Sequence, residues 1–595
     1  MLSPLRTRHA PQEAVLSLEV QARMAATDPE QADSFRLLVR HFLERFFNNE
    51  MASADGEGKK RLIQVALAVG LPGFILAMYL YPPYHDIRAP RPYWAQVGDH
   101  YFFVMYSLVA LAIVTIFEWD FFFPDRLDVF VLSTLPIKAR QLFLARITAI
   151  AIFIVGFLFD SNFLAPLVLP ASTDPPHLAR FLTAHLLSVT LSGIFAAALV
   201  LAIQGVLLAT LGERLFRKVS LPLQALSITA LFTLLLLSPV LAGTLREWLS
   251  LKSAAVLYLP PFWFLGLYQY LLEGSSALSV FARLAQIACT ATALAVAVAV
   301  VSYPFAYLRR TRQLVEGSGK GRARRGLSAP LHQAFHAALF FRPLSRAMSD
   351  YIGQTLLRVP RYRIYLVMYG GLGVAIIAAS VVRFHFAQAE LRFGFSADGL
   401  RAAVPIVAFW TIAGLRASFL APADQKGKWI FRVIQGKPHL DQFLAVKHWT
   451  QLWGTILSLA TVALVHMLAP LEAGGWRAAA VQALVAIALC MLLADAFFLR
   501  VKIIPFTGMP VASPTNMAFI LIQYLGLFPP LILITLGLEP LLETSLSHLL
   551  VAGLAVALAH TGLVMIHRRI VAEYTQQKEL DDDEEEFPQS LGLRY

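Results

Sequence analysis

Apolar blocks of about 20 residues recur along the whole chain, separated by short polar stretches. A transmembrane helix needs about this many apolar residues to cross the hydrocarbon core of a bilayer. Hydrophobic residues make up 57% of the chain and charged residues only 15%, whereas about a quarter of a soluble chain is charged. The blocks exclude a soluble enzyme, a disordered protein and a disulfide scaffold. They also argue against a membrane β-barrel, whose strands alternate over about 10 residues.

We therefore predict an all-α polytopic membrane protein with about twelve transmembrane helices. The predicted spans form two groups of six, separated by a basic linker, and the 181–211 block is long enough to require tilt or projection beyond the bilayer. The first six are 62–81, 101–117, 147–169, 181–211, 221–243 and 281–306, and the second six are 364–384, 403–420, 449–469, 478–499, 517–537 and 546–567.

Basic residues favour one orientation of these spans. With both termini in the cytoplasm, 39 of the 50 Lys and Arg residues fall in cytoplasmic segments, as the positive-inside rule requires. The net charge of +12 is then explained by membrane topology rather than by nucleic-acid binding. The predicted domains are an N-terminal segment (1–60), a first six-span half (61–306), a basic linker (307–363), a second six-span half (364–567) and a C-terminal tail (568–595).

One segment before the first span is amphipathic. In Phe35–Phe47, apolar residues follow helical spacing and Arg36, Arg40, Glu44 and Arg45 lie between them. A basic helix with an aromatic face suits the membrane interface. A helix packed on a partner protein is the alternative.

The two halves carry similar loops after their second spans. Loop 118–146 and loop 421–448 each begin at a proline followed closely by an aspartate, continue through a bulky apolar cluster, and reach Phe-Leu-Ala before the next span. Phe143 and Phe443 are the phenylalanines of this last string. The shared order predicts two parallel six-helix repeats, an arrangement known in transporters. The alternative is chance similarity of aromatic interfacial loops.

The chain carries no signature of ATP chemistry. Gly317-Ser318-Gly319-Lys320-Gly321 lacks the upstream glycine and the following Ser or Thr of a phosphate-binding loop. Neither a histidine cluster nor a nucleophilic-serine motif is found, and both cysteines, Cys289 and Cys490, fall inside apolar blocks. We expect no catalytic residues, no metal site and no cofactor in this chain.

A few ionisable residues lie alone inside predicted spans, chiefly Asp160, Arg416 and Asp495. Intramembrane charges are functional candidates by default. A structural role is the simpler interpretation, in which Arg416 pairs with one of the two acids and holds the bundle together.

The loop between the fifth and sixth spans is long and aromatic. Its core, Tyr258–Gly274, reads YLPPFWFLGLYQYLLEG. Trp and Tyr favour the membrane–water interface. We expect a short helix that re-enters or lies on the outer leaflet, as an external gate, a lipid-facing lip or a simple interfacial anchor.

Together these features resemble the ABC-2 class of ABC-transporter permeases, in particular a bacterial subgroup with two permease halves fused in one chain. The strings PDRLDVFVLSTLPIKARQLFLAR, LPPFWFLGLYQYLLEG and RVKIIPFTGMP carry the resemblance. In that family an interfacial connecting helix precedes the first span, the loop after the second span docks in the ATPase, and re-entrant helices separate spans five and six. The short loop 538–545 departs from this pattern, because it leaves no room for a second external hairpin.

The resemblance implies a role for each of these segments. Phe35–Phe47 matches the connecting helix, Pro124–Arg146 and Pro422–Lys447 the two coupling loops, and Pro260–Gly274 the external hairpin. The implied coupling residues are Pro124, Asp125, Arg126, Phe130, Leu132, Pro136, Phe143, Pro422, Asp424, Trp429, Phe431 and Arg432, and the implied hairpin residues are Pro260, Pro261, Trp263 and Tyr268.

The function implied is that of the permease subunit of an ATP-driven exporter in the bacterial inner membrane. ATP and Mg²⁺ would be bound by partner ATPase subunits, two per chain, and the substrate is not indicated. Three other classes stay open: an ion-coupled secondary transporter, a non-transporting regulator or scaffold of an ATPase, and a transferase acting on lipid-linked substrates. The acidic run 579–587 is expected to be a solvated tail, with docking to a basic partner as the alternative.

Overall fold

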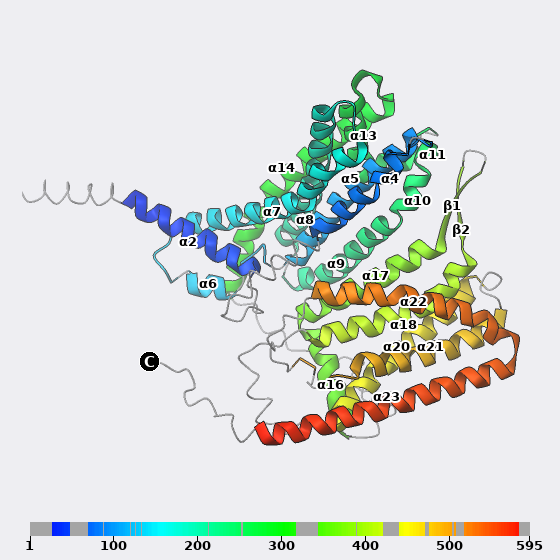
Figure 1. The fold of residues 1–595 in the computed structure, drawn as a ribbon. Coiled ribbons are helices and arrows are strands. Elements are labelled where there is room, and N and C mark those ends of the chain that lie inside the picture. Colours follow the sequence, from blue (N-terminus) through cyan, green and yellow to red (C-terminus); the bar gives the residue numbers. More distant parts are fainter. Residues whose placement is uncertain are drawn as a thin grey trace, which may run out of the picture.

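Long apolar helices form most of the computed structural model, in two bundles that lie against each other (Figure 1). The structure describes residues 27–47, 69–316, 343–420, 440–469, 475–501, 505–506 and 517–581. Within these ranges, positions 87, 120, 125, 133, 212, 251–253 and 388–389 are not described.

The first bundle is built from long helices joined by short ones. The chain is helical over 69–79. The named helices are α2 (Thr27–Phe47), α4 (Tyr81–Tyr84), α5 (Tyr93–Phe117), α6 (Arg126–Leu132), α7 (Ala139–Thr173), α8 (Leu178–Thr210), α9 (Glu213–Leu236), α10 (Ser238–Gly243), α11 (Leu245–Ser250), α12 (Ala254–Tyr258), α13 (Pro260–Glu273), the 3₁₀ turn η1 (Gly274–Ser276) and α14 (Ser279–Glu316).

The second bundle contains a small sheet as well as helices. Its elements are α16 (Pro343–Arg358), α17 (Pro360–Val381), β1 (Val382–Ala387), β2 (Glu390–Phe395), α18 (Ala397–Leu420), α20 (Leu440–Leu468), α21 (Gly475–Phe498), α22 (Met517–Thr544) and α23 (Leu546–Asp581). The helices α22 and α23 are separated only by Ser545, as the short predicted loop 538–545 requires.

Ten helices of the described residues are long and apolar enough to cross a membrane. Each coincides with one of the twelve predicted spans. Of the other two, 62–81 is described only in part, and 364–384 corresponds to α17, whose apolar part Tyr365–Val381 is shorter. The chain is thus an all-α polytopic membrane protein apart from one hairpin.

Several helices extend beyond the apolar blocks that predict them. The helix α14 continues ten residues past the end of 281–306, through Arg309, Arg310 and Arg312, and α23 similarly continues to Asp581. Hydropathy marks where a span leaves the hydrocarbon core, but Arg, Gln, Glu and Leu are good helix formers. The helices therefore continue into the polar segments.

The predicted span 364–384 ends earlier than expected, because the chain changes to strand at Val382. β1 and β2 pair antiparallel, with Val382 opposite Phe395 and Ala387 opposite Glu390. The segment Val382–Ala387 alternates bulky apolar and polar residues, a pattern typical of strands. The hairpin connects α17 to α18 and stands clear of the helices in Figure 1.

The direction of the helices defines two ends of the molecule. The helices α2, α6 and α16 precede or connect spans at one end, called here the amphipathic-helix end. The β1–β2 hairpin and the short helices α10 and α11 lie at the other, called here the hairpin end (Figure 1).

The two bundles meet along α9 and α17. On α17, a Cβ at Gly371 would lie 2.9 Å from Thr229 Oγ1 and 3.5 Å from Ile228 Cγ2, both on α9. Only glycine permits so close an approach. Phe117 and Phe232 of the first bundle also pack against the buried cluster around Tyr369 and Trp410 of the second. The contact between the bundles is therefore a packed apolar interface.

Candidate functional site

A buried arginine connects three elements at the amphipathic-helix end. Arg146, in the second turn of α7, forms an ion pair with Asp128 of α6, with 3.0 Å between Nη1 and Oδ2. Its Nη2 donates to the carbonyl oxygens of Phe121 and Phe123, each at 2.8 Å. Its guanidinium also lies over the ring of Phe42 of α2, 5.0 Å from the centroid. We call these five residues the Arg146 junction.

The geometry of the junction suits arginine in particular. Both charged side chains are only 3% exposed. A buried charge is costly unless it is paired and hydrogen-bonded, and the planar guanidinium serves the carboxylate, two carbonyls and an aromatic face together. Gln141 of α7 adds a bond to Ser34 of α2, 2.8 Å from Nε2 to Oγ. The short helix α6 is therefore fixed to α7, and α7 is fixed in turn to α2.

A carboxyl close in sequence to the junction carries no bond on one oxygen. Glu118 follows the last residue of α5, and its Oε2 is buried without a hydrogen-bond partner among the described residues. Burial raises the pKa of Glu118 to about 8. Ionisation of this carboxyl is therefore disfavoured relative to that of an exposed glutamate.

The other face of α6 presents apolar side chains outward. Phe130 and Val131 are each 56% exposed, and Leu135, just after the helix, is 45% exposed. Thr134 closes the turn by donating to the carbonyl of Val131. Leu132, by contrast, is buried in the core of the first bundle. We call Phe130, Val131 and Leu135 the α6 knob. These apolar side chains project from the α6 segment, which the Arg146 junction anchors through Asp128.

The second bundle has an amphipathic helix in an equivalent position. The helix α16 precedes α17 and packs on α20, the third long helix of its half, as α2 packs on α7. Met348, Ile352 and Leu356, spaced four residues apart, are buried with Phe443 and Trp449 of α20. This segment lies within the predicted basic linker 307–363, where no helix was predicted, although the i, i+4 spacing of its apolar residues indicates one.

The predicted residues of the first coupling loop divide into anchors and exposed groups. Pro124 and Leu132 are buried, Phe143 is half-buried against Tyr303 and Tyr307, and Phe130 and Pro136 are exposed. Arg126 begins α6, with its side chain outside the described set, and Asp125 is not described. In the second loop, Pro422, Asp424, Trp429, Phe431 and Arg432 lie outside the described residues, whereas the last residues of the loop belong to α20, which begins at Leu440.

The aromatic segment predicted as an external hairpin is a helix packed inside the first bundle. α13 contacts α5, α8 and α14. Pro261 and Tyr268 are buried, whereas Pro260 and Trp263 are half-buried, and Trp263 Nε1 donates to the carbonyl of Leu257 at 2.8 Å. Tyr268 stacks on His100 at 4.2 Å between ring centroids and shares a 3.1 Å hydrogen bond with His185. A lipid-facing lip does not fit this burial.

The intramembrane charges do not pair as expected. Arg416 donates from Nε to the carbonyl of Phe497 at 3.1 Å and lies over the ring of Phe498, so its expected ion pair with Asp160 or Asp495 is wrong. A buried guanidinium can be satisfied by a carbonyl and an aromatic face when the acids point elsewhere. Asp160 is half-buried on α7, and its Oδ2 has no hydrogen-bond partner among the described residues.

Asp495 has two other partners. Lys447 Nζ lies 2.7 Å from its Oδ1, and His560 Nδ1 lies 2.5 Å from its Oδ2. The three residues come from α20, α21 and α23, so this network ties the last helix to the bundle. The sequence does not predict either pairing, since Lys447 ends the predicted loop Pro422–Lys447 and His560 lies alone in the predicted span 546–567.

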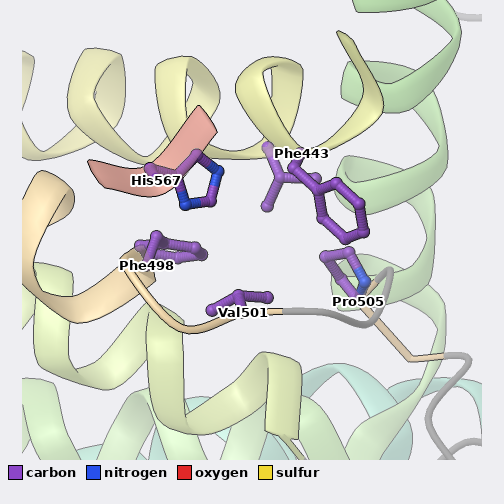
Figure 2. A pocket seen from close by; sticks show the side chains of 6 residues that line it. Phe443, Phe498, Val501, Pro505 and His567 are labelled. Atoms are coloured by element: carbon purple, nitrogen blue, oxygen red, sulfur yellow. The ribbon is translucent and has the colours of Figure 1, made fainter. Parts of the chain in front are cut away.

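Figure 2 shows a pocket of the second bundle between α20, α21 and α23. Its lining consists of Phe443 and Val446 of α20, Phe498 of α21, Val501, Pro505 and His567 of α23, and it is small and partly open to solvent. The ring of His567 is the one polar side chain in this lining, and it already donates from Nδ1 to the carbonyl of Leu499 at 3.0 Å. The pocket is therefore an apolar recess with little room for a ligand.

Among the described residues, no group of three or more His, Cys, Asp or Glu side chains is arranged to hold a metal ion. Comparison of the chain with models of known protein families, with curated proteins and with solved structures returned no match.

Proposed function

We propose that this chain is the membrane-spanning permease subunit of an ATP-driven exporter of the ABC-2 type, with the ATPase supplied by separate subunits. The observation that carries the proposal is the α6 knob: exposed apolar side chains on a short helix that a buried ion pair fixes to α7. Exposed apolar patches of this kind mark protein–protein contacts. A docking helix must also be rigid if it is to transmit movement.

Two further observations support a duplicated architecture. In each half an amphipathic helix precedes the first long helices and packs on the third span, α2 on α7 and α16 on α20. The same end carries the predicted coupling loops and the excess of Lys and Arg, which the positive-inside rule assigns to the cytoplasm. In this proposal, two ATPase subunits closing on ATP push the loops and the halves rock about the α9–α17 contact.

The network of Lys447, Asp495 and His560 favours a second candidate. Buried ionisable residues inside a helical bundle are typical of proton and ion pathways. An ion-coupled secondary transporter would use Asp495 as an exchanging group between Lys447 and His560. Such a carrier would need no ATPase, and the exposed α6 knob would then have no assigned role.

Co-purification separates the two candidates. The full chain is extracted in mild detergent, and the proteins that come with it are identified and counted by mass spectrometry. We expect an ATPase at two copies per chain, and we expect Phe130→Ser with Val131→Ser to reduce its recovery by about tenfold or more, since central apolar contacts dominate such interfaces.

The matched control is Phe305→Ser on α14, because Phe305 is as exposed as Phe130 but lies on a membrane span. This variant should keep the ATPase. A chain that is extracted alone, and stays alone after cross-linking in intact membranes, would favour the ion-coupled carrier.

A further inference from the structure

A second group of polar side chains converges at the hairpin end of the second bundle. It is separate from the Asp495 network, whose members belong to α20, α21 and α23. Its members are Arg401 of α18, His466 of α20, Gln482 of α21, and Glu539 and Glu543 of α22. Three helices of an otherwise apolar bundle, α18, α20 and α21, thus contribute one ionisable or amide side chain each, and α22 contributes two. Polar residues inside a membrane bundle are expensive and usually functional.

Glu539 is the unusual member of this group. It is only 1% exposed, yet neither carboxylate oxygen has a hydrogen-bond partner among the described residues. Gln482, fully buried, faces Glu539 without meeting hydrogen-bonding geometry, and its Nε2 has no partner either. Buried polar groups are almost always satisfied, so two neighbouring groups that do not complete a hydrogen bond with each other mark a place where a ligand could bind both.

The groups around Glu539 offer oxygen atoms. Pro540 follows it within α22 and has no N–H, so the carbonyl of Leu536 lacks its intrahelical donor. The amide of Gln482 bonds His466 at 3.0 Å through Oε1. Because a neutral imidazole nitrogen can accept as well as donate, rotation of this amide would turn its oxygen toward Glu539 and keep the bond to His466. Carboxylate, carbonyl and amide oxygens are the ligands preferred by hard cations.

The charge balance of the group also favours a cation. Glu543 lies one helical turn from Glu539, about 6 Å nearer the hairpin end, and forms a loose ion pair with Arg401, with 3.7 Å between Nη2 and Oε2. Arg401 and Glu543 are 24% and 23% exposed. This pair is therefore internally balanced and lies on the more exposed side of the group, and an ionised Glu539 would add one negative charge that the pair does not balance.

We propose that Glu539, Gln482 and the carbonyl of Leu536 bind a single positive charge, carried by an alkali-metal cation or by a small protonated amine that enters past Arg401 and Glu543. The inference concerns binding by this chain alone. It does not depend on an ATPase partner, so its failure would leave the proposed permease function untouched, and the reverse holds too.

Isothermal titration of the full-length chain in lipid nanodiscs tests this site. Sodium chloride, potassium chloride and methylammonium chloride are titrated separately at constant ionic strength, balanced with N-methyl-D-glucamine chloride, whose polyol chain is too bulky for an enclosed site. We expect saturable one-to-one binding in at least one arm, and the arm that saturates identifies the source of the charge. Glu539→Gln should weaken that binding about tenfold or more, as expected for loss of a charged ligand.

Three variants make the result decisive. Glu573→Gln, the same change at an exposed position on α23, should bind as the native chain does. Glu539→Asp keeps the charge and should keep binding with altered preference among the cations, and Gln482→Leu should weaken it. Absence of saturation in all three arms, or equal binding by the native chain and Glu539→Gln, would overturn the proposal and leave Glu539 as a buried neutral acid.

Discussion

Two buried ion pairs of similar design lie at the same end of the molecule. Arg146 pairs with Asp128 in the first half, and Lys447 pairs with Asp495 in the second. In both cases the cation lies near the start of the third long helix of its half. The acids differ in position, because Asp128 belongs to the short helix α6 and Asp495 to the span α21. The first pair therefore fixes a connecting element, whereas the second fixes the bundle.

Removing one partner of the first pair should be costly. Arg146→Met leaves Asp128 without its arginine and two carbonyl oxygens without a donor, and we expect the free energy of unfolding to fall by about 3–5 kcal/mol. Denaturant unfolding in mixed micelles measures this change. The double variant Arg146→Met with Asp128→Leu should recover much of the loss, because no charge is then buried alone.

Arg140→Met is the control for this prediction. Arg140 lies in the first turn of α7 but is exposed, so its loss should change the stability by no more than about 0.5 kcal/mol. Equal effects of Arg140→Met and Arg146→Met would contradict the role given to the junction.

At the residue scale the sequence identifies candidates but not partners. Asp495 stands out because an acid inside an apolar block is rare. Its partners Lys447 and His560 are 48 and 65 residues away in sequence, and no periodic pattern relates such positions. Arg416 illustrates the same limit: its charge predicts a need for an acceptor, but only the packing shows that the acceptor is a backbone carbonyl.

At the scale of elements, hydropathy predicts that a membrane-spanning helix is present more reliably than it predicts where that helix begins and ends. All ten helices long enough to span a membrane match predicted blocks. Their ends differ, because α14 and α23 continue into charged segments that favour helix as strongly as the apolar ones do. The hairpin and α16 were missed for another reason: a search for apolar blocks of 20 residues passes over a six-residue strand and a short amphipathic helix.

Two histidines attach helix α23 to its bundle, together with apolar contacts such as that of Val571. Its most apolar stretch is not buried at all within the protein, and His560 and His567 bond Asp495 and the carbonyl of Leu499 on or next to α21. We expect His560→Ala with His567→Ala to increase amide hydrogen exchange in α23, since both of these bonds to the bundle are then lost.

His548→Ala is the comparison variant, because His548 bonds only locally, to Thr544 and Leu541. Exchange in α23 that is unchanged in the double variant would show that lipid and apolar contacts alone hold the helix in place. Mass spectrometry of nanodisc-embedded protein resolves the two cases.

At the scale of the whole molecule, the contact between α9 and α17 decides how the halves sit together. Gly371→Leu should force them apart, since its Cβ would already lie 2.9 Å from Thr229. Overpacking of this kind typically costs about 1–3 kcal/mol, so the thermal midpoint of the solubilised chain should fall.

Gly370→Leu is an unusually close control, because nothing lies within 4 Å of a Cβ at this neighbouring position. It should leave the midpoint nearly unchanged. If Gly371→Leu and Gly370→Leu lowered the thermal midpoint equally, the decrease would reflect helix propensity or solubility and not separation of the halves. The sequence predicts two halves, but it does not predict which helices join them, because both contact faces are as apolar as the lipid-facing ones.

The shape of α7 has a mechanical consequence. It is a helix of 35 residues, roughly 52 Å at 1.5 Å per residue, and the Arg146 junction fastens α6 to its first turns. Pro166 and Pro170 interrupt its hydrogen-bond ladder near the far end. We therefore expect α7 to move as a rigid rod from its first turns, where α6 is attached, to the turn of Asp160, and to bend more easily beyond that turn. A push on the knob should tilt this rigid part as one body, and the bending should concentrate around Pro166, directly past Asp160.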